Sequence, residues 1–469
     1  MRQTAAIVGV AALLLFAGCG SLVGGQDTAA PTATDVSTAD QSDGSGPAVQ
    51  TTADGADTPT ASPTAAPTPT ATATPTSSPT PTATQTPTES PTTTVTPTPT
   101  ATPDGESTPD VEVSGGNLSV DEDAIYADIQ SLLGTDVEPP TVYVRDEMPG
   151  LERYNEYFAA NPFYQTFGYG DEFINTSVYH GSASPQRIIV MPKNASERQA
   201  KTLLAHEFVH WMQFHSDAIN TEGFGDFVDD TDSQQVSAGL VEGASVYVTD
   251  QYVDRYMNTS WNQTQELRAQ YEQGPAGRRL FRARYLFGAQ YIHSQVDNPR
   301  NVSWLYDEST PTPVTGEQLI HGYTPSEEPE RNLTLSVNDT AGWEVTSRHH
   351  DTKGELVVRT MLRAELNRST AAEAAAGWGS DKTVRMRHAE NESRLGIAWA
   401  LRWDDASEAD EFAAAFDDWQ SERPENDDTA YRLVRIDDET VAIVAGDDGF
   451  VSNATLAGSN ANVTVEAGS

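Results

Sequence analysis

A long segment built from very few residue types limits how much of this chain can fold. Apart from three residues, every position from Thr58 to Pro103 is Thr, Pro, Ala or Ser, and no Lys or Arg occurs from Gln26 to Asn117. Such a segment has almost no apolar side chains to bury, so burial cannot offset the entropy lost when the chain is ordered. We therefore predict a disordered Thr/Pro-rich stalk over residues 20–117 and a folded part over residues 118–469.

The first 19 residues have the organisation of an export signal. Arg2 precedes an apolar run from Ala5 to Phe16, and small residues follow up to Cys19, which is the only cysteine of the chain. A run of this length is too short to cross a bilayer and suits the core of a signal peptide. Ala17-Gly18-Cys19 resembles a lipobox, which implies a lipoprotein-type signal over residues 1–19 and a lipid on Cys19. An ordinary signal peptide with a chance cysteine is the alternative.

Charge and sequons add to this prediction of export. The 69 acidic residues outnumber the 28 basic ones, giving a formal net charge of −41. This balance excludes a nucleic-acid binder that works through a basic surface, and it is typical of proteins dissolved in concentrated salt. Asn-x-Ser/Thr sequons, which predict an exported glycoprotein, occur at Asn117, Asn175, Asn194, Asn258, Asn262, Asn301, Asn332, Asn338, Asn367, Asn391, Asn453 and Asn462.

Hydrophobic spacing in the folded part predicts a mixed α+β fold. Helices are expected at 120–133, 196–214, 237–256, 264–272, 278–295, 353–375 and 407–419. Strands are expected at 141–145, 187–191, 383–387, 395–403, 431–436 and 440–444. The last helices and strands form a smaller C-terminal α/β unit, which we place at residues 351–469. Its acidic residues, among them Asp404, Asp417 and Asp418, are interpreted as a solvated face, with calcium binding as a minor alternative because no EF-hand spacing is present.

The helix expected after the 187–191 strand carries the strongest chemical signal. His206-Glu207-Phe208-Val209-His210 matches H-E-x-x-H. A step of four residues on a helix turns both imidazoles to one face, where they can bind one metal ion, with Glu207 placed as a general base. About 0.01 such matches are expected by chance in a chain of this composition. The flanking residues are apolar, so two histidines and a glutamate would be costly to bury without a metal or other partners.

A catalytic zinc needs a third protein ligand. His215 is a poor candidate because nine helical residues place it on the face opposite His206. Glu242 is the better one, because it is the only ionisable residue within the apolar run Leu240-Val241-Glu242-Gly243-Ala244. The alternative for Glu242 is a carboxylate that faces solvent.

The motif HEFVH followed by LVEGAS resembles the gluzincin zinc metallopeptidases. This resemblance implies a metallopeptidase-like domain over residues 118–350, with the active-site helix behind a small sheet, His206, His210 and Glu242 as ligands of Zn²⁺, and Glu207 as base. A looser likeness runs through 285–289, 315–321 and 377–381, and the whole chain looks like a haloarchaeal family of exported surface lipoproteins. One departure from gluzincins is Val246, where they have an Asp that orients a zinc-bound histidine. The partner that orients the histidines is therefore open.

These residues predict a cell-surface zinc metallopeptidase whose partners are a peptide or protein substrate and, through the lipid on Cys19, the outer face of the cell membrane. Peptide hydrolysis also needs a donor for the oxyanion. His321 and Tyr247 are candidates, although an isolated His or Tyr is more often structural. A surface glycoprotein with a structural or relic zinc site, acting in adhesion or envelope architecture, is the main alternative. A structural site would fill all four zinc positions with protein ligands, whereas a catalytic site leaves one to water. A solute-binding lipoprotein fits the anchor but does not explain HEFVH.

Overall fold

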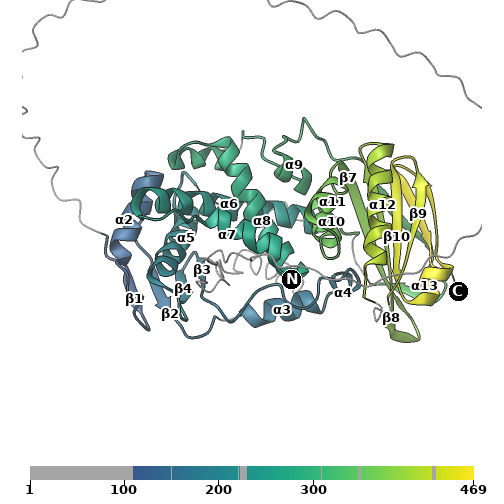
Figure 1. Cartoon of the computed structure of the whole chain (residues 1–469), viewed down its shortest axis with the longest axis horizontal. Helices are drawn as coiled ribbons and strands as arrows, with labels where there is room; N and C mark the ends of the chain where they lie inside the picture. Colours follow the sequence, from purple (N-terminus) through teal and green to yellow (C-terminus); the bar gives the residue numbers. More distant parts are fainter. Residues whose placement is uncertain are drawn as a thin grey trace, which may run out of the picture. The chain divides into compact units, whose positions relative to one another are not determined.

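The computed structural model describes residues 109–148, 150–219, 221, 230–307, 309–346, 350–424 and 429–468 (Figure 1). All of these residues belong to one compact unit of mixed α+β structure. The predicted signal peptide with Cys19, and the predicted stalk up to residue 108, lie outside the described residues. No helix in the described ranges combines the length and the apolar character that crossing a membrane requires.

A four-stranded sheet opens the fold. Its order is β1-β2-β4-β3, formed by β1 (Glu112–Ser114), β2 (Thr141–Val144), β4 (Arg187–Met191) and β3 (His180–Ser184). The first three strands are parallel, and β3 runs antiparallel to β4 at the edge. The predictions of β2 and β4 are confirmed. β3 was not predicted, because its sequence has no alternation of apolar residues. β1 lies within the range predicted as stalk, so the fold begins before residue 118.

Two long helices follow this sheet and carry the predicted motifs. α5 (Glu197–His215) begins at a capping box in which Ser196 and Gln199 exchange hydrogen bonds, as the sequence predicted. α6 (Thr231–Tyr256) begins earlier than the predicted Ser237, because Asp230 caps the helix and accepts a hydrogen bond from the backbone of Ser233. α2 (Glu122–Leu133) packs on both helices.

A third long helix, α8 (Ala276–Gln295), lies directly against α6. The contact depends on glycine, because a Cβ at Gly243 would overlap the backbone of Gly288, and a Cβ at Gly288 would overlap the backbone of Gly239. The two helix backbones therefore touch over one turn, which holds Glu242 of α6 in a fixed position relative to Tyr285 of α8.

Shorter helices complete this part of the fold: α3 (Leu151–Ala159), α4 (Pro162–Thr166), α7 (Gln263–Gln273), the 3₁₀ helix η1 (Pro299–Tyr306) and α9 (Gly316–His321). The single helix predicted over 353–375 is wrong. It is divided into α10 (Gly354–Leu362) and α11 (Arg368–Glu373). Asn367 caps α11 through its side chain, and the Arg363 guanidinium donates to the carbonyl of Leu366, so the intervening turn has its own hydrogen bonds.

The C-terminal part is an antiparallel sheet of five strands in the order β6-β7-β8-β10-β9. These are β6 (Trp343–Val345), β7 (Trp378–His388), β8 (Asn391–Trp403), β10 (Thr440–Gly446) and β9 (Ala430–Asp437). The predictions of β7 to β10 and of the helix α12 (Ala406–Ser421), which packs against β8 and β10, are confirmed (Figure 1). Further elements are α13 (Asp448–Asn453) and a small sheet of β11 (Thr455–Ser459), β12 (Asn462–Glu466) and β5 (Thr334–Asp339).

Alternation along β8 separates two hydrophobic cores. Ile397, Trp399 and Leu401 belong to the main core, which also contains residues of α5, α6 and α8, whereas Ala398 and Ala400 face a smaller core with β5 and β12. The main core is thus continuous across the predicted boundary between residues 350 and 351. β5 and β6, which precede this boundary, also pair with C-terminal strands.

Candidate metal centre

The side chains of His206, His210 and Glu242 converge. On α5, the four-residue step brings His206 Nε2 within 3.1 Å of His210 Nε2. Glu242 Oε2, from α6, lies 3.3 Å from His206 Nε2 and 3.0 Å from His210 Nε2. The three residues are between 0% and 7% exposed. The sequence-predicted ligand set is therefore assembled in one place, by two helices that the core holds together.

This arrangement fits a zinc ion. Tetrahedral zinc with ligands at about 2.0–2.2 Å requires ligand atoms about 3.3–3.6 Å apart. The observed triangle has sides of 3.0, 3.1 and 3.3 Å, so a small outward movement of the side chains would admit the ion. Two imidazoles and one carboxylate are also a donor set that zinc prefers. Within the described ranges, no further histidine, cysteine or acidic side chain joins this group of three.

The electrostatics of the group also favour a cation. Burial alone would raise the pKa of Glu242, but the attraction of His210 and the hydrogen bonds to both imidazoles outweigh it and hold that pKa well below its ordinary value. Burial opposes the charged form of His210, yet the attraction to Glu242 outweighs it and raises the pKa of His210 to about 9. Burial lowers the pKa of His206. The buried carboxylate thus needs one positive charge, from a proton on His210 or from a metal ion.

Buried polar side chains orient the two histidines. Gln213 Oε1 lies 2.6 Å from His210 Nδ1, and Gln213 Nε2 donates to the carbonyl of Val241 at 3.0 Å and to the hydroxyl of Tyr306 at 2.7 Å. The side-chain amide of Gln263 contacts His206 Nδ1 at 3.2–3.3 Å. Gln213 and Gln263 thus contact the Nδ1 atoms of the two histidines, whose partners the sequence left open.

Neither glutamine was predicted from the sequence as a functional residue. Gln213 had a usable signal, because it is a polar residue three positions after His210 on the same helix face and next to apolar neighbours. Gln263 had none, since it is the first residue of a separate helix, α7, far along the chain. Tyr285, whose hydroxyl donates to Glu242 Oε1 at 3.0 Å, fell only within a stretch of loose family likeness.

The predicted base, Glu207, is fully buried on α5 beside the edge strand β3. Gly181 of β3 lies directly against it, because a Cβ at this position would come within 2.7 Å of Glu207 Cγ. The same strand therefore defines the space around the carboxylate. Among the residues that the structure describes, β3 is the last strand of its sheet.

The other sequence-predicted donors have no described contact with the cluster. His321 lies 3.0 Å from a carboxylate oxygen of Glu355 and stacks on Tyr323. Tyr247 is five residues after Glu242, which turns it away from that face of α6, and its ring contacts His293. Their proposed role as oxyanion donors stays a prediction.

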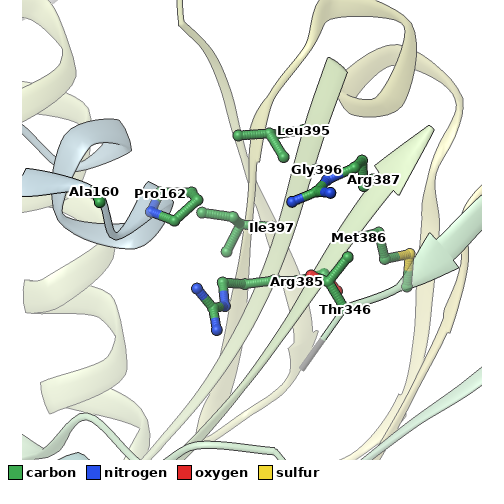
Figure 2. Close-up of a pocket in the computed structure, with 9 residues that line it drawn as sticks. All are labelled: Ala160, Pro162, Thr346, Arg385, Met386, Arg387, Leu395, Gly396 and Ile397. Atoms are coloured by element: carbon green, nitrogen blue, oxygen red, sulfur yellow. The ribbon is translucent and has the colours of Figure 1, made fainter. Parts of the chain in front are cut away.

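A cavity of about 230 Å³ lies elsewhere, between the start of α4 and strands β7 and β8. Figure 2 shows Ala160 and Pro162 on one side of it and Arg385, Gly396 and Ile397 on the other. It contains none of the predicted site residues.

A family model described as a domain of unknown function (DUF8575) matches residues 343–456. This range runs from β6 to the beginning of β11, so it includes the five-stranded sheet and α12 and excludes the histidine cluster. No curated protein and no solved structure matches the chain.

Proposed function

We propose that this protein is a zinc-dependent metallopeptidase. The observation that carries the proposal is the convergence of His206, His210 and Glu242 beside Glu207, on the helices α5 and α6, which pack against each other. His206, His210 and Glu242 would hold the ion, and zinc bound there would polarise a carbonyl and lower the pKa of a water molecule.

The residues of the chain supply the proton transfer. Glu207 would accept the proton of the attacking water and pass it to the leaving amine, as its place beside the ligands on α5 allows. Gln213 and Gln263 would keep the imidazole Nε2 atoms directed at the ion by holding each Nδ1. Tyr285 would hold Glu242 through the oxygen that does not face the imidazoles.

The edge strand β3 supports a peptide as the substrate class. An extended peptide can add to the edge strand of a sheet through main-chain hydrogen bonds. The contact between Gly181 and Glu207 means that a peptide paired with β3 would pass close to the base. The scissile carbonyl and the base would then come from neighbouring elements.

The place of action proposed here is the cell surface. The lipoprotein-type signal ending at Cys19 and the stalk would tether the folded part to the outer face of the membrane. None of the twelve sequon asparagines is buried, which is compatible with glycan attachment.

A second candidate is a surface glycoprotein in which zinc is structural, acting in adhesion or envelope architecture. The observation that favours it is the low exposure of the group, since Glu207 is 0% and Glu242 is 4% exposed. A substrate carbonyl has to reach the ion, whereas a structural ion needs no access.

Zinc content and peptide cleavage, measured together, separate the two candidates. Glu207→Gln should bind one zinc per chain and lose about 10²-fold to 10⁴-fold in cleavage rate. Glu197→Gln, on the exposed first turn of the same helix and paired with Lys201, is the matched control and should cleave at the wild-type rate. Zinc bound without cleavage by any of the three proteins would favour the structural candidate, and no bound zinc would overturn both.

A further inference from the structure

Three carboxylates that take no part in the histidine cluster meet at a second place. Glu317 lies in the first turn of α9, Glu328 in the segment between α9 and β5, and Asp404 between β8 and α12. One oxygen of each side chain lies within 4.8 Å of the other two. The chain thus brings together three acidic groups from two distant regions of the sequence.

Glu317 is the unusual member of this acidic triad. This residue is only 5% exposed. Among the residues that the structure describes, no hydrogen bond or ion pair reaches its carboxylate, although it points at Glu328 and Asp404. Burial, reinforced by the charge of Glu355 and of the other two acids, raises the pKa of Glu317 to about 10. A buried carboxylate without a partner is costly, so this position calls for a ligand.

The positively charged side chains nearby already form ion pairs. Glu355 is paired with Arg359 and with His321, whose Nε2 lies 3.0 Å away. Arg331 Nε lies 2.9 Å from Asp404 Oδ1. The three carboxyl groups of the triad therefore have one guanidinium between them. If all three are ionised, two negative charges are left uncompensated. A single divalent cation would compensate both.

We propose that Glu317, Glu328 and Asp404 bind a divalent cation, and that this cation is calcium. All the side-chain donors are carboxylate oxygens, which hard cations prefer. Oxygens at about 2.3–2.6 Å from Ca²⁺ lie up to about 5 Å apart, in keeping with the mutual distances within 4.8 Å. Water molecules complete the coordination, because three carboxylates supply only part of the six to eight oxygens that Ca²⁺ takes.

The position of the triad gives the ion a structural role. α9 packs against α6, which carries Glu242, and against α8 and α10. Asp404 follows β8, the central strand of the C-terminal sheet. Calcium bound here ties the helices of the candidate metal centre to that sheet, independently of what occupies the histidine cluster.

The first measurement is calcium bound to the full-length protein by equilibrium dialysis, with zinc present in saturating amount and at constant ionic strength. We expect one Ca²⁺ per chain in the wild type. Glu317→Gln should bind Ca²⁺ about tenfold or more weakly, because it removes one charge and one ligand while preserving the shape of the side chain. The matched control is the double variant Asp417→Asn/Asp418→Asn, which removes two exposed acids of α12 and should bind as the wild type does.

The second measurement is thermal unfolding with and without CaCl₂, with MgCl₂ as a parallel arm. Calcium should raise the midpoint of the wild type and leave that of Glu317→Gln unchanged. Without calcium, Glu317→Gln should unfold at the same or a higher temperature than the wild type, because repulsion within the triad is reduced. If Glu317→Gln does not fold, the same two measurements are made on Asp404→Asn, which changes a half-buried residue of the triad.

Four outcomes would contradict the proposal. Absence of calcium binding to the wild type would mean that protons, not a metal ion, neutralise the triad. Equal binding by Glu317→Gln would place the ion elsewhere. Equal loss in the Asp417→Asn/Asp418→Asn control would assign the binding to the general acidic surface. A larger response to MgCl₂ than to CaCl₂ would contradict the choice of calcium.

Discussion

The hydroxyl of Tyr285 donates a hydrogen bond to Glu242 Oε1 at 3.0 Å, while Glu242 Oε2 faces both imidazoles. The two oxygens of the Glu242 carboxylate thus have different partners. The backbones of α6 and α8 are in contact at glycines, which fixes the position of Tyr285 relative to Glu242. The hydrogen bond therefore orients Glu242, the third proposed ligand. Tyr285, which is not a proposed ligand, thus helps to fix the geometry of the cluster.

We expect Tyr285→Phe to weaken zinc binding about tenfold to a hundredfold while the fold is kept, since loss of a group that orients a ligand has an effect of this size. The measurement is zinc affinity by competition with a chelator. Tyr291→Phe, a buried position on the same helix with a ring contact to Trp304, is the control and should bind zinc as the wild type does. Equal affinities in the two variants would mean that Tyr285 does not orient Glu242.

Gln213 should matter for stability as well as for zinc. Gln213→Leu removes the shorter of two contacts to His210 Nδ1, leaving the one from the Ser245 hydroxyl at 3.2 Å, and leaves the buried carbonyl of Val241 without this donor. We expect unfolding in urea to show a loss of about 1–3 kcal/mol, together with weaker zinc binding. Gln199→Leu would instead disturb only the capping box at the start of α5, and it should lower stability without changing zinc affinity. Unchanged stability in Gln213→Leu would contradict the role given to its amide.

The sequence predicts those parts of the fold in which local chemistry decides the structure. The capping box at Ser196, the apolar run of β4 and the four-residue step from His206 to His210 are all local patterns, and the structure agrees with each. The pairing of Glu242 with the histidines was also predictable, because an ionisable side chain in an apolar helix needs a buried partner.

The elements that were missed depend on contacts distant in sequence. β3 contains His, Gly, Ser and Ala and is a strand because β4 pairs with it. Gln263 reaches His206 across 57 residues, and no local pattern marks such a contact. The break between α10 and α11 follows from hydrogen bonds of Arg363 and Asn367 that helix spacing alone does not reveal.

Asp381 provides a prediction about pH. Its buried carboxylate accepts hydrogen bonds from the indoles of Trp378 and Trp399 and from the backbone N–H groups of Lys353 and Gly354. Burial nevertheless outweighs these donors and raises the pKa of Asp381 from 3.8 to about 6. A carboxyl whose pKa is higher in the folded than in the unfolded state favours folding most at low pH, and this contribution is lost as the pH rises through the folded value.

We therefore expect the stability contributed by Asp381 to fall between about pH 4 and pH 6 and to be constant above that range. The measurement is the free energy of unfolding of the wild type and of Asp381→Asn at several pH values. Asp381→Asn should be destabilised at every pH, since its amide group faces N–H donors, and the difference from the wild type should be smaller at pH 7 than at pH 4. A difference that grows with pH would mean that the carboxyl is ionised more readily in the folded protein.

Gly181 offers the sharpest test of the link between β3 and the proposed base. In Gly181→Ala the new Cβ would come within 2.7 Å of Glu207 Cγ, so the glutamate has to move, whereas His206, His210 and Glu242 keep their places. We expect zinc binding to be retained and peptide cleavage to fall about 100-fold, the effect of displacing a catalytic group by about 1 Å. Ala183→Gly, a similar small change in the same strand, should leave cleavage within a few-fold of the wild type. Cleavage by Gly181→Ala at the wild-type rate would contradict the role of Glu207 as the general base.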